Sequence, residues 1–176
     1  MMLNALLPPP DGNSYLLGDT VTESVFITSL VWSIGASLLD DGRIKFDGYL
    51  KRLSGLSTNP SEKGTIPAGE IPSALPTLFD YYFDVENQNW VAWSAKVPEY
   101  EHDPEMRFNE ILVPTVDTVR STWLVELMVR INRPVVLVGE TGTSKSATVH
   151  SFLRGLDRDV YVSVKCFSLL SYFNFK

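Results

Sequence analysis

Residues 139–146 carry the one pattern in this chain whose residue types and spacing match a recognisable chemistry. They fit the phosphate-binding loop G-x-x-x-x-G-K-[ST] at every fixed position but one, because Ser144 stands where the pattern has glycine. In such a loop, successive backbone N–H groups form an anion-sized concavity, and the dipole of the following helix adds positive potential. A Cβ at residue 144 is tolerable only if the backbone there does not need a positive φ angle.

The candidate phosphate-binding residues form one continuous stretch: Gly139, Glu140, Thr141, Gly142, Thr143, Ser144, Lys145 and Ser146. We expect Lys145 to reach the β- and γ-phosphates of ATP and the Ser146 hydroxyl to ligate Mg²⁺. The context supports this expectation, since residues 135–138 predict a buried strand and residues 147–153 predict an amphipathic helix. A plain Gly/Thr/Ser turn that binds nothing is the alternative. No catalytic residue is assigned.

Several separate stretches resemble the dynein heavy chain family, in its axonemal form. Residues 111–118, the helix rich in Trp123, Leu124, Leu127 and Met128, and residues 132–146 closely resemble the third AAA+ module of that family. Residues 90–105 are similar to the connector before this module, and residues 30–36 are similar to the helical end of the second module. The serine at position 144 is also familiar in axonemal members. The resemblance spans roughly residues 22–160.

This resemblance implies a parent protein that is a microtubule motor of the cilium, whose third module binds nucleotide and regulates the stroke. It implies ATP and Mg²⁺ as cofactors, and it places Val113, Pro114 and Thr115 near the adenine. The implied partners are the remainder of the heavy chain and the axonemal dynein complex, with microtubules reached only through the parent motor. The implied location is the cytoplasm and cytoskeleton, in the axoneme of the cilium.

The expected fold class is α/β: a partial P-loop AAA+ nucleotide-binding domain preceded by a helical hairpin and a β-hairpin connector. Residues 54–78, rich in Pro, Ser and Gly, predict a flexible linker. The expected segments are residues 1–53 as a helical end of a preceding module, 54–78 as the linker, 79–110 as the β-hairpin connector, 111–160 as the start of the nucleotide-binding domain and 161–176 as a divergent tail. In the helical segment, Asp40 and Asp41 are expected to end one helix before a shorter second one.

Composition excludes several other classes of protein. The 176 residues carry 15 basic and 21 acidic side chains, and this net charge of −6 argues against nucleic acid or an anionic membrane as a partner. Residues 25–39 are the most apolar stretch, but they are too short and too polar to span a bilayer. No basic residue precedes Arg43, which argues against a secretory signal, and the single Cys166 excludes an internal disulfide.

Three other features have a functional and a structural interpretation. The acidic residues of segment 99–110 could bind a hard cation, but a solvated loop accounts for them better because their spacing is irregular. His150 follows the loop in the expected helix and is interpreted as a surface residue. Trp90 and Trp93 are interpreted as packing anchors of the hairpin rather than as a ligand-binding pair.

Hydrolysis of ATP needs carboxylates that complete the Mg²⁺ shell and polarise the attacking water. No Asp or Glu follows Asp159, and residues 161–176 no longer resemble the dynein family. The sequence therefore leaves open whether the chain is an enzyme. The alternative to an ATP-binding part of a motor is a truncated, non-catalytic product with no motor or ATPase activity of its own.

Overall fold

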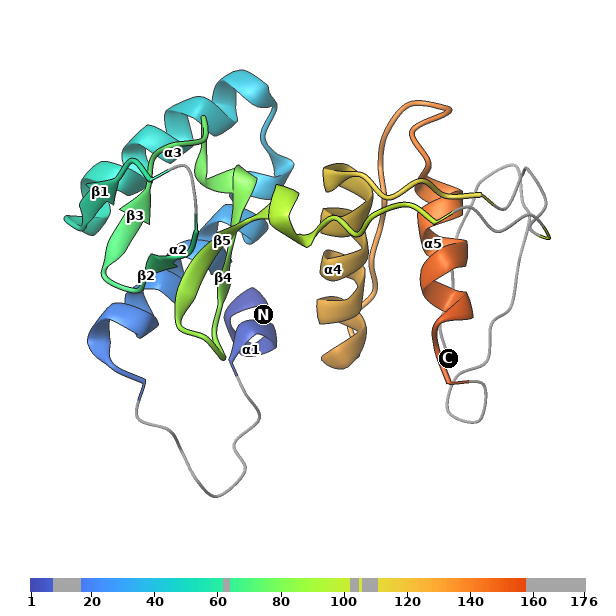
Figure 1. Cartoon of the computed structure of the whole chain (residues 1–176), viewed down its shortest axis with the longest axis horizontal. Helices are drawn as coiled ribbons and strands as arrows, with labels where there is room; N and C mark the ends of the chain where they lie inside the picture. Colours follow the sequence, from blue (N-terminus) through green and yellow to red (C-terminus); the bar gives the residue numbers. More distant parts are fainter. Residues whose placement is uncertain (8–16, 62–63, 102–104, 106–110, 158–176) are drawn as a thin grey trace. The chain divides into compact units, whose positions relative to one another are not determined.

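The computed structural model describes residues 1–7, 17–61, 64–101, 105 and 111–157. The chain divides into two compact units, residues 1–97 and residues 98–176 (Figure 1). Each unit is described by itself below. Among the described residues, none of the helices combines the length and the apolar character needed to cross a bilayer.

The first unit begins with three α-helices, α1 (Met2–Leu6), α2 (Asp19–Ser33) and α3 (Asp40–Ser54). A short 3-10 helix, η1 (Gly35–Ser37), follows α2. Asp40 and Asp41 therefore begin a helix instead of ending one, which corrects the sequence prediction, and α3 is as long as α2. The physical reason is that carboxylates in the first turn interact favourably with the positive end of the helix dipole.

The strands of the first unit form two small sheets. In one, β1 (Ser57–Asn59) pairs in parallel with β3 (Glu70–Pro72); in the other, β5 (Asn89–Ala92) lies between β2 (Ile66–Pro67) and β4 (Tyr81–Asp84), antiparallel to both. The β4–β5 hairpin has a four-residue turn, at residues 85–88. Two further 3-10 helices flank this hairpin, η2 (Leu78–Asp80) and η3 (Trp93–Lys96).

The prediction of a flexible linker at residues 54–78 is wrong. Strands β1, β2 and β3 all lie in this segment, and Ile66 and Ile71 are almost completely buried. Composition misled here because Pro and Gly also punctuate short strands and tight turns, as Gly69 does with its φ of +96°. Two buried isoleucines supply the apolar contacts that order the segment.

The core of the first unit is aromatic. Trp32 of α2 meets the rings of Phe79 and Trp93 edge-on, with centroids 5.8 and 6.0 Å apart. Directly after α2, the backbone at Gly35 passes so close to the Phe79 ring that an added Cβ would lie 2.7 Å from its Cζ atom. Trp90 and Trp93 are 1% and 0% exposed, which confirms their interpretation as packing anchors.

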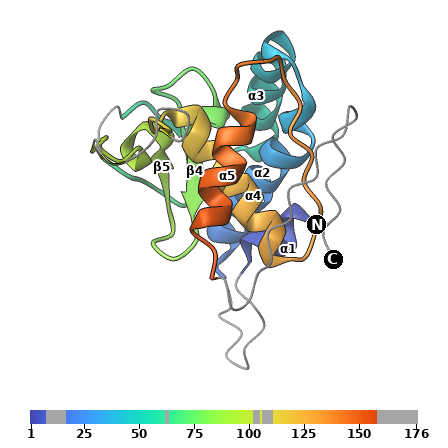
Figure 2. The same ribbon diagram turned by 90° about the vertical axis from the view of Figure 1, so that its right-hand side faces the viewer.

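The second unit contains two described α-helices, α4 (Val116–Arg130) and α5 (Lys145–Arg154), which lie side by side (Figures 1 and 2). Helix α4 confirms the helix expected around Trp123 and Leu127. It begins at a capping box, in which the Thr115 hydroxyl accepts a hydrogen bond from the Thr118 N–H and the Thr118 hydroxyl accepts one from the Thr115 N–H.

Residues 135–138 do not form the predicted strand. Their side chains alternate in exposure as strand residues do, and Val136 and Val138 are 81% and 90% exposed. A buried strand of a parallel sheet requires hydrogen-bonded neighbours. The described part of the second unit contains no strand that could provide such neighbours. The expected divergent tail, residues 161–176, lies outside the described residues.

Candidate phosphate-binding site

The candidate loop connects the end of α4 to the start of α5. Past α4 the chain reverses at Asn132, which has a φ of +53°, and the Arg133 N–H donates to the Met128 carbonyl at 2.9 Å. The apolar residues 135–138 then lead into Gly139. All eight candidate residues are exposed except Lys145, which is partly covered. The loop is therefore open to a ligand from solvent.

Two residues of the loop have a left-handed backbone conformation. Gly142 has a φ of +88°, which suits a residue without a Cβ. Ser144 has a φ of +56° and a ψ of +12° and is the N-cap residue of α5. The structure thus answers the question raised by the missing glycine: position 144 does need positive φ. A serine in this conformation costs about 1 kcal/mol relative to an unstrained one.

The start of α5 offers backbone donors to an anion. The hydroxyl and the N–H of Thr148 both donate to the Ser144 carbonyl, at 3.0 and 2.9 Å, and these bonds fix the first turn. The first N–H groups of a helix have no partner within it, and the first turn of α5 contains no acidic residue that would compete with an anion. The exposed hydroxyl of Ser146 lies in the same turn.

The side chain of Lys145 lies back over its own loop. Its Nζ donates to the Glu140 carbonyl oxygen and to the Thr143 hydroxyl, the latter at 2.8 Å. Thr143 in turn donates to the Glu140 carbonyl at 2.9 Å. These three contacts bring together three of the residues expected to bind phosphate. The sequence pattern gave no signal for them, because it specifies residue types and not side-chain rotamers.

The three residues expected near the adenine lie immediately before α4. Val113 is 51% exposed, Pro114 is partly buried, and Thr115 caps the helix. None of the hydrogen bonds found among the described residues joins them to the loop. Their placement near an adenine therefore stays a prediction.

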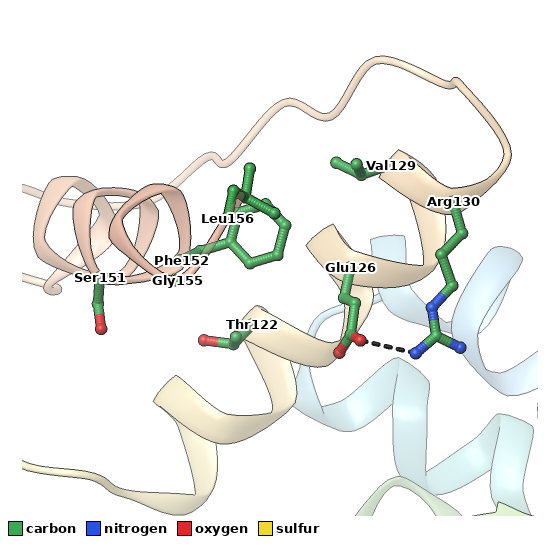
Figure 3. Close-up of a pocket in the computed structure, with 8 residues that line it drawn as sticks. All are labelled: Thr122, Glu126, Val129, Arg130, Ser151, Phe152, Gly155 and Leu156. Atoms are coloured by element: carbon green, nitrogen blue, oxygen red, sulfur yellow. Dashed lines mark hydrogen bonds and ion pairs between the residues drawn. The ribbon is translucent and has the colours of Figure 1, made fainter. Parts of the chain in front are cut away.

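A separate groove of about 450 Å³ lies between α4 and α5 (Figure 3). On its α5 side, Phe152 and Leu156 point toward α4, and on its α4 side the Arg130 guanidinium pairs with the Glu126 carboxylate at 2.6 Å. The residues that line it are Thr122, Glu126, Val129, Arg130, Ser151, Phe152, Gly155 and Leu156. No residue of the candidate loop lines this groove.

The described residues contain no group of three or more His, Cys, Asp or Glu side chains arranged to hold a metal ion. Most of the acidic segment 99–110 lies outside the described residues, so its interpretation stays open. His150 lies in α5 and is partly buried. The contact expected between the Ser146 hydroxyl and Mg²⁺ stays a prediction.

Three side chains of strand β4 in the hairpin have shifted pKa values. Burial raises the pKa of the Tyr81 and Tyr82 phenols. Burial also acts to raise the pKa of Asp84, but hydrogen bonds from the Asn87 side chain and from the Asn87 and Glu86 N–H groups outweigh it, and with nearby Lys96 they lower the pKa below its ordinary value. These shifts concern the stability of the hairpin and not phosphate chemistry.

Two family matches cover nearly the whole chain. Residues 2–95 match the dynein heavy chain AAA lid domain, and residues 100–172 match the P-loop containing dynein motor region. The junction between the matches coincides with the junction between the two compact units at Val97 and Pro98. The expected linker is thus an internal part of the lid region, and the second match covers most of the segment expected to be a divergent tail.

Relatives with similar sequences are dynein heavy chains. The chain is 50% identical to dynein axonemal heavy chain 10 of Homo sapiens, over 92% of this chain and 4% of that protein. It is 34% identical to the dynein-1-alpha heavy chain, flagellar inner arm I1 complex, of Chlamydomonas reinhardtii, over 81% of this chain and 3% of that protein. It is 33% identical to dynein axonemal heavy chain 2 of Homo sapiens, over 84% and 3%. The chain thus spans only a few per cent of the length of these relatives.

Proposed function

Because the chain belongs to the dynein heavy chain family and combines a AAA lid with a P-loop nucleotide-binding region, we propose that residues 139–146 bind the triphosphate of ATP together with Mg²⁺. The observation that carries this proposal is the geometry where the loop meets α5. A turn with two left-handed residues, Gly142 and Ser144, ends directly at the N-terminus of a ten-residue helix. Its first turn is free of acidic side chains, and its first residue is Lys145.

In this proposal the backbone supplies most of the phosphate contacts, through the N–H groups of the loop and of the first turn of α5. Lys145 supplies the charge that neutralises the β- and γ-phosphates. Ser146 offers its hydroxyl to Mg²⁺, which screens the phosphate charges when bound. Val113, Pro114 and Thr115 are proposed to lie near the adenine.

The wider assignment follows from the relatives. They include axonemal and flagellar heavy chains, which supports a role for this chain in an axonemal dynein, in the cytoskeleton of the cilium. Its partners would then be the remainder of the heavy chain and the axonemal dynein complex, and microtubules only through the whole motor.

A substitution of the loop lysine tests the proposal. We expect Lys145→Ala to remove most of the affinity of the chain for labelled Mg·ATP, because a charge-assisted contact to phosphate is lost. The matched control is Arg133→Ala, which removes one positive charge from an exposed residue of the same unit but outside the loop. Equal affinity of Lys145→Ala and the unmodified chain would reject the assignment.

A non-catalytic role is the second candidate, and a specific observation favours it for this sequence. In this sequence, Asp157 and Asp159 are the only carboxylates after the loop, and residues 160–176 contain none, so few acids are available there to orient an attacking water. We expect the 176-residue chain to bind ATP without releasing phosphate above background. Phosphate release that survives purification and disappears in Lys145→Ala would contradict this and show that a carboxylate of this chain orients the attacking water.

A further inference from the structure

The ammonium group of Lys145 is already bound by acceptors of its own loop. It donates to the Thr143 hydroxyl at 2.8 Å and to the Glu140 carbonyl oxygen, and the Thr143 hydroxyl donates to the same carbonyl at 2.9 Å. The three groups form a closed ring of hydrogen bonds. Because the Thr143 hydroxyl donates its proton to the Glu140 carbonyl, the lone pairs of the hydroxyl oxygen are available to accept a hydrogen bond from Lys145.

This ring lies against the first glycine of the loop. A Cβ added to Gly139 would lie 3.2 Å from the Thr143 hydroxyl oxygen and 3.7 Å from Nζ of Lys145. The lysine therefore lies across the loop, above Gly139, instead of extending into solvent. These acceptors use two of the three N–H donors of the ammonium, so a phosphate that accepts more than one hydrogen bond from it must replace at least one of them.

We propose that Thr143 is a positioning residue that holds Lys145 against the empty loop and thereby weakens nucleotide binding. This inference rests on the proposed function of the loop. An interaction that stabilises only the unbound state lowers the apparent affinity by the fraction of molecules it withdraws from the binding-competent state. Thr143 sets this fraction through its hydroxyl, which is the side-chain acceptor of the ammonium, whereas the other acceptor is a backbone carbonyl.

Three substitutions separate the hydroxyl from the rest of the side chain. Thr143→Val keeps the branched shape but removes the acceptor, whereas Thr143→Ser keeps the hydroxyl. Ser151→Ala is the matched control, since it removes an exposed hydroxyl from α5, outside the loop. Both side chains are exposed, so the substitutions leave the packing of α4 and α5 intact.

The first measurement needs no nucleotide. It follows the exchange of the Lys145 ammonium protons with water by ¹H–¹⁵N NMR of the full 176-residue chain at low temperature. The exchange rate reports how firmly the hydrogen bonds hold the ammonium. We expect exchange to be several-fold faster in Thr143→Val and unchanged in Thr143→Ser and Ser151→Ala. Unchanged exchange in Thr143→Val would overturn the proposal that its hydroxyl holds the lysine.

The second measurement is the affinity of the same proteins for Mg·ATP. We expect Thr143→Val to bind about fivefold more tightly, the factor that corresponds to one hydrogen bond of ordinary net strength. Thr143→Ser and Ser151→Ala should match the unmodified chain. Unchanged or weaker binding by Thr143→Val would overturn the claim that the contact opposes nucleotide.

The two measurements distinguish this inference from the proposed function. If the unmodified chain and all variants fail to bind Mg·ATP, the proposed function fails, and the claim that Thr143 weakens nucleotide binding fails with it. The claim that Thr143 holds Lys145 is still decided, because the exchange of the ammonium protons is measured without nucleotide.

Discussion

The carboxylate of Asp47 in α3 accepts a hydrogen bond of 2.7 Å from the backbone N–H of Leu78, at the start of η2. The two residues are 31 positions apart, and both are buried. The other carboxylate oxygen pairs with Lys51 at 2.9 Å. This carboxylate therefore joins α3, the last α-helix of the first unit, to the segment that leads into the β4–β5 hairpin.

We expect Asp47→Ala to lower the free energy of unfolding of the first unit by about 2 kcal/mol, because it leaves a buried N–H without its acceptor. The control is Lys51→Ala, which removes only the partly exposed ion pair and should cost less than about 1 kcal/mol. Urea denaturation, with hydrogen exchange at the Leu78 amide as a local probe, measures both. Equal costs for the two substitutions would show that the hydrogen bond to Leu78 contributes little.

Asp84 makes the stability of the β4–β5 hairpin depend on pH. Its carboxylate accepts hydrogen bonds from the Glu86 and Asn87 N–H groups and from the Asn87 side chain, and its folded-state pKa is lower than its ordinary value of 3.8. A depressed carboxyl pKa adds stability above the unfolded-state pKa, and this stability is lost as pH falls through the folded-state value.

We therefore expect Asp84→Asn to destabilise the hairpin at neutral pH and to have progressively less effect as the pH falls below about 4. Denaturation of the two proteins between pH 2 and 7 gives the comparison. A stability difference between them that does not change over this range would contradict the role of the ionised carboxylate. Glu86→Gln is the control, since the Glu86 side chain is exposed and accepts none of these bonds.

Ser144→Gly should relieve the left-handed strain at the start of α5. The gain in local stability is about 1 kcal/mol, because glycine has no Cβ to clash at a φ of +56°. We expect affinity for Mg·ATP to stay the same or to improve. Protection of the α5 amides from hydrogen exchange measures the stability, and a large loss of affinity would show instead that the serine hydroxyl is itself a ligand.

The exposed valines before the loop predict the behaviour of the chain in solution. Val136 and Val138 are 81% and 90% exposed in a segment that pairs with no described strand, and such apolar, unpaired segments promote association. We expect the double substitution Val136→Thr and Val138→Thr to reduce aggregation, measured by light scattering against concentration. The control is Val135→Thr, at a partly buried position, which should not improve solubility.

The sequence was sufficient for the parts of the structure that depend on local patterns. The helix around Trp123, the burial of Trp90 and Trp93 and the presence of a helix after the loop all follow from periodicity or from a motif. The prediction of a flexible linker at residues 54–78 was wrong because the burial of two isoleucines, Ile66 and Ile71, outweighs the effect of the Pro- and Gly-rich composition around them. Only tertiary contacts reveal that balance.

The prediction of a strand at residues 135–138 was wrong for a different reason. Its residue types favour a strand, but a strand also needs hydrogen-bonded neighbours, and those are a property of the surrounding chain. At the site, the motif predicted which residues form the loop but not the φ of Ser144 or the contacts of the Lys145 ammonium. Both depend on the backbone path and the rotamers, which a pattern of residue types does not specify.

The most direct test of the central claim follows the backbone amides of the loop during a titration. We predict that Mg·ATP shifts the ¹H–¹⁵N signals of Gly139, Gly142 and Lys145, and that inorganic pyrophosphate shifts them in the same direction, because the N–H groups bind phosphate. Adenosine, which has no phosphate, should leave these three signals in place. Loop signals that do not respond to millimolar Mg·ATP, or that respond equally to adenosine, would contradict the assignment of residues 139–146 as a phosphate-binding site.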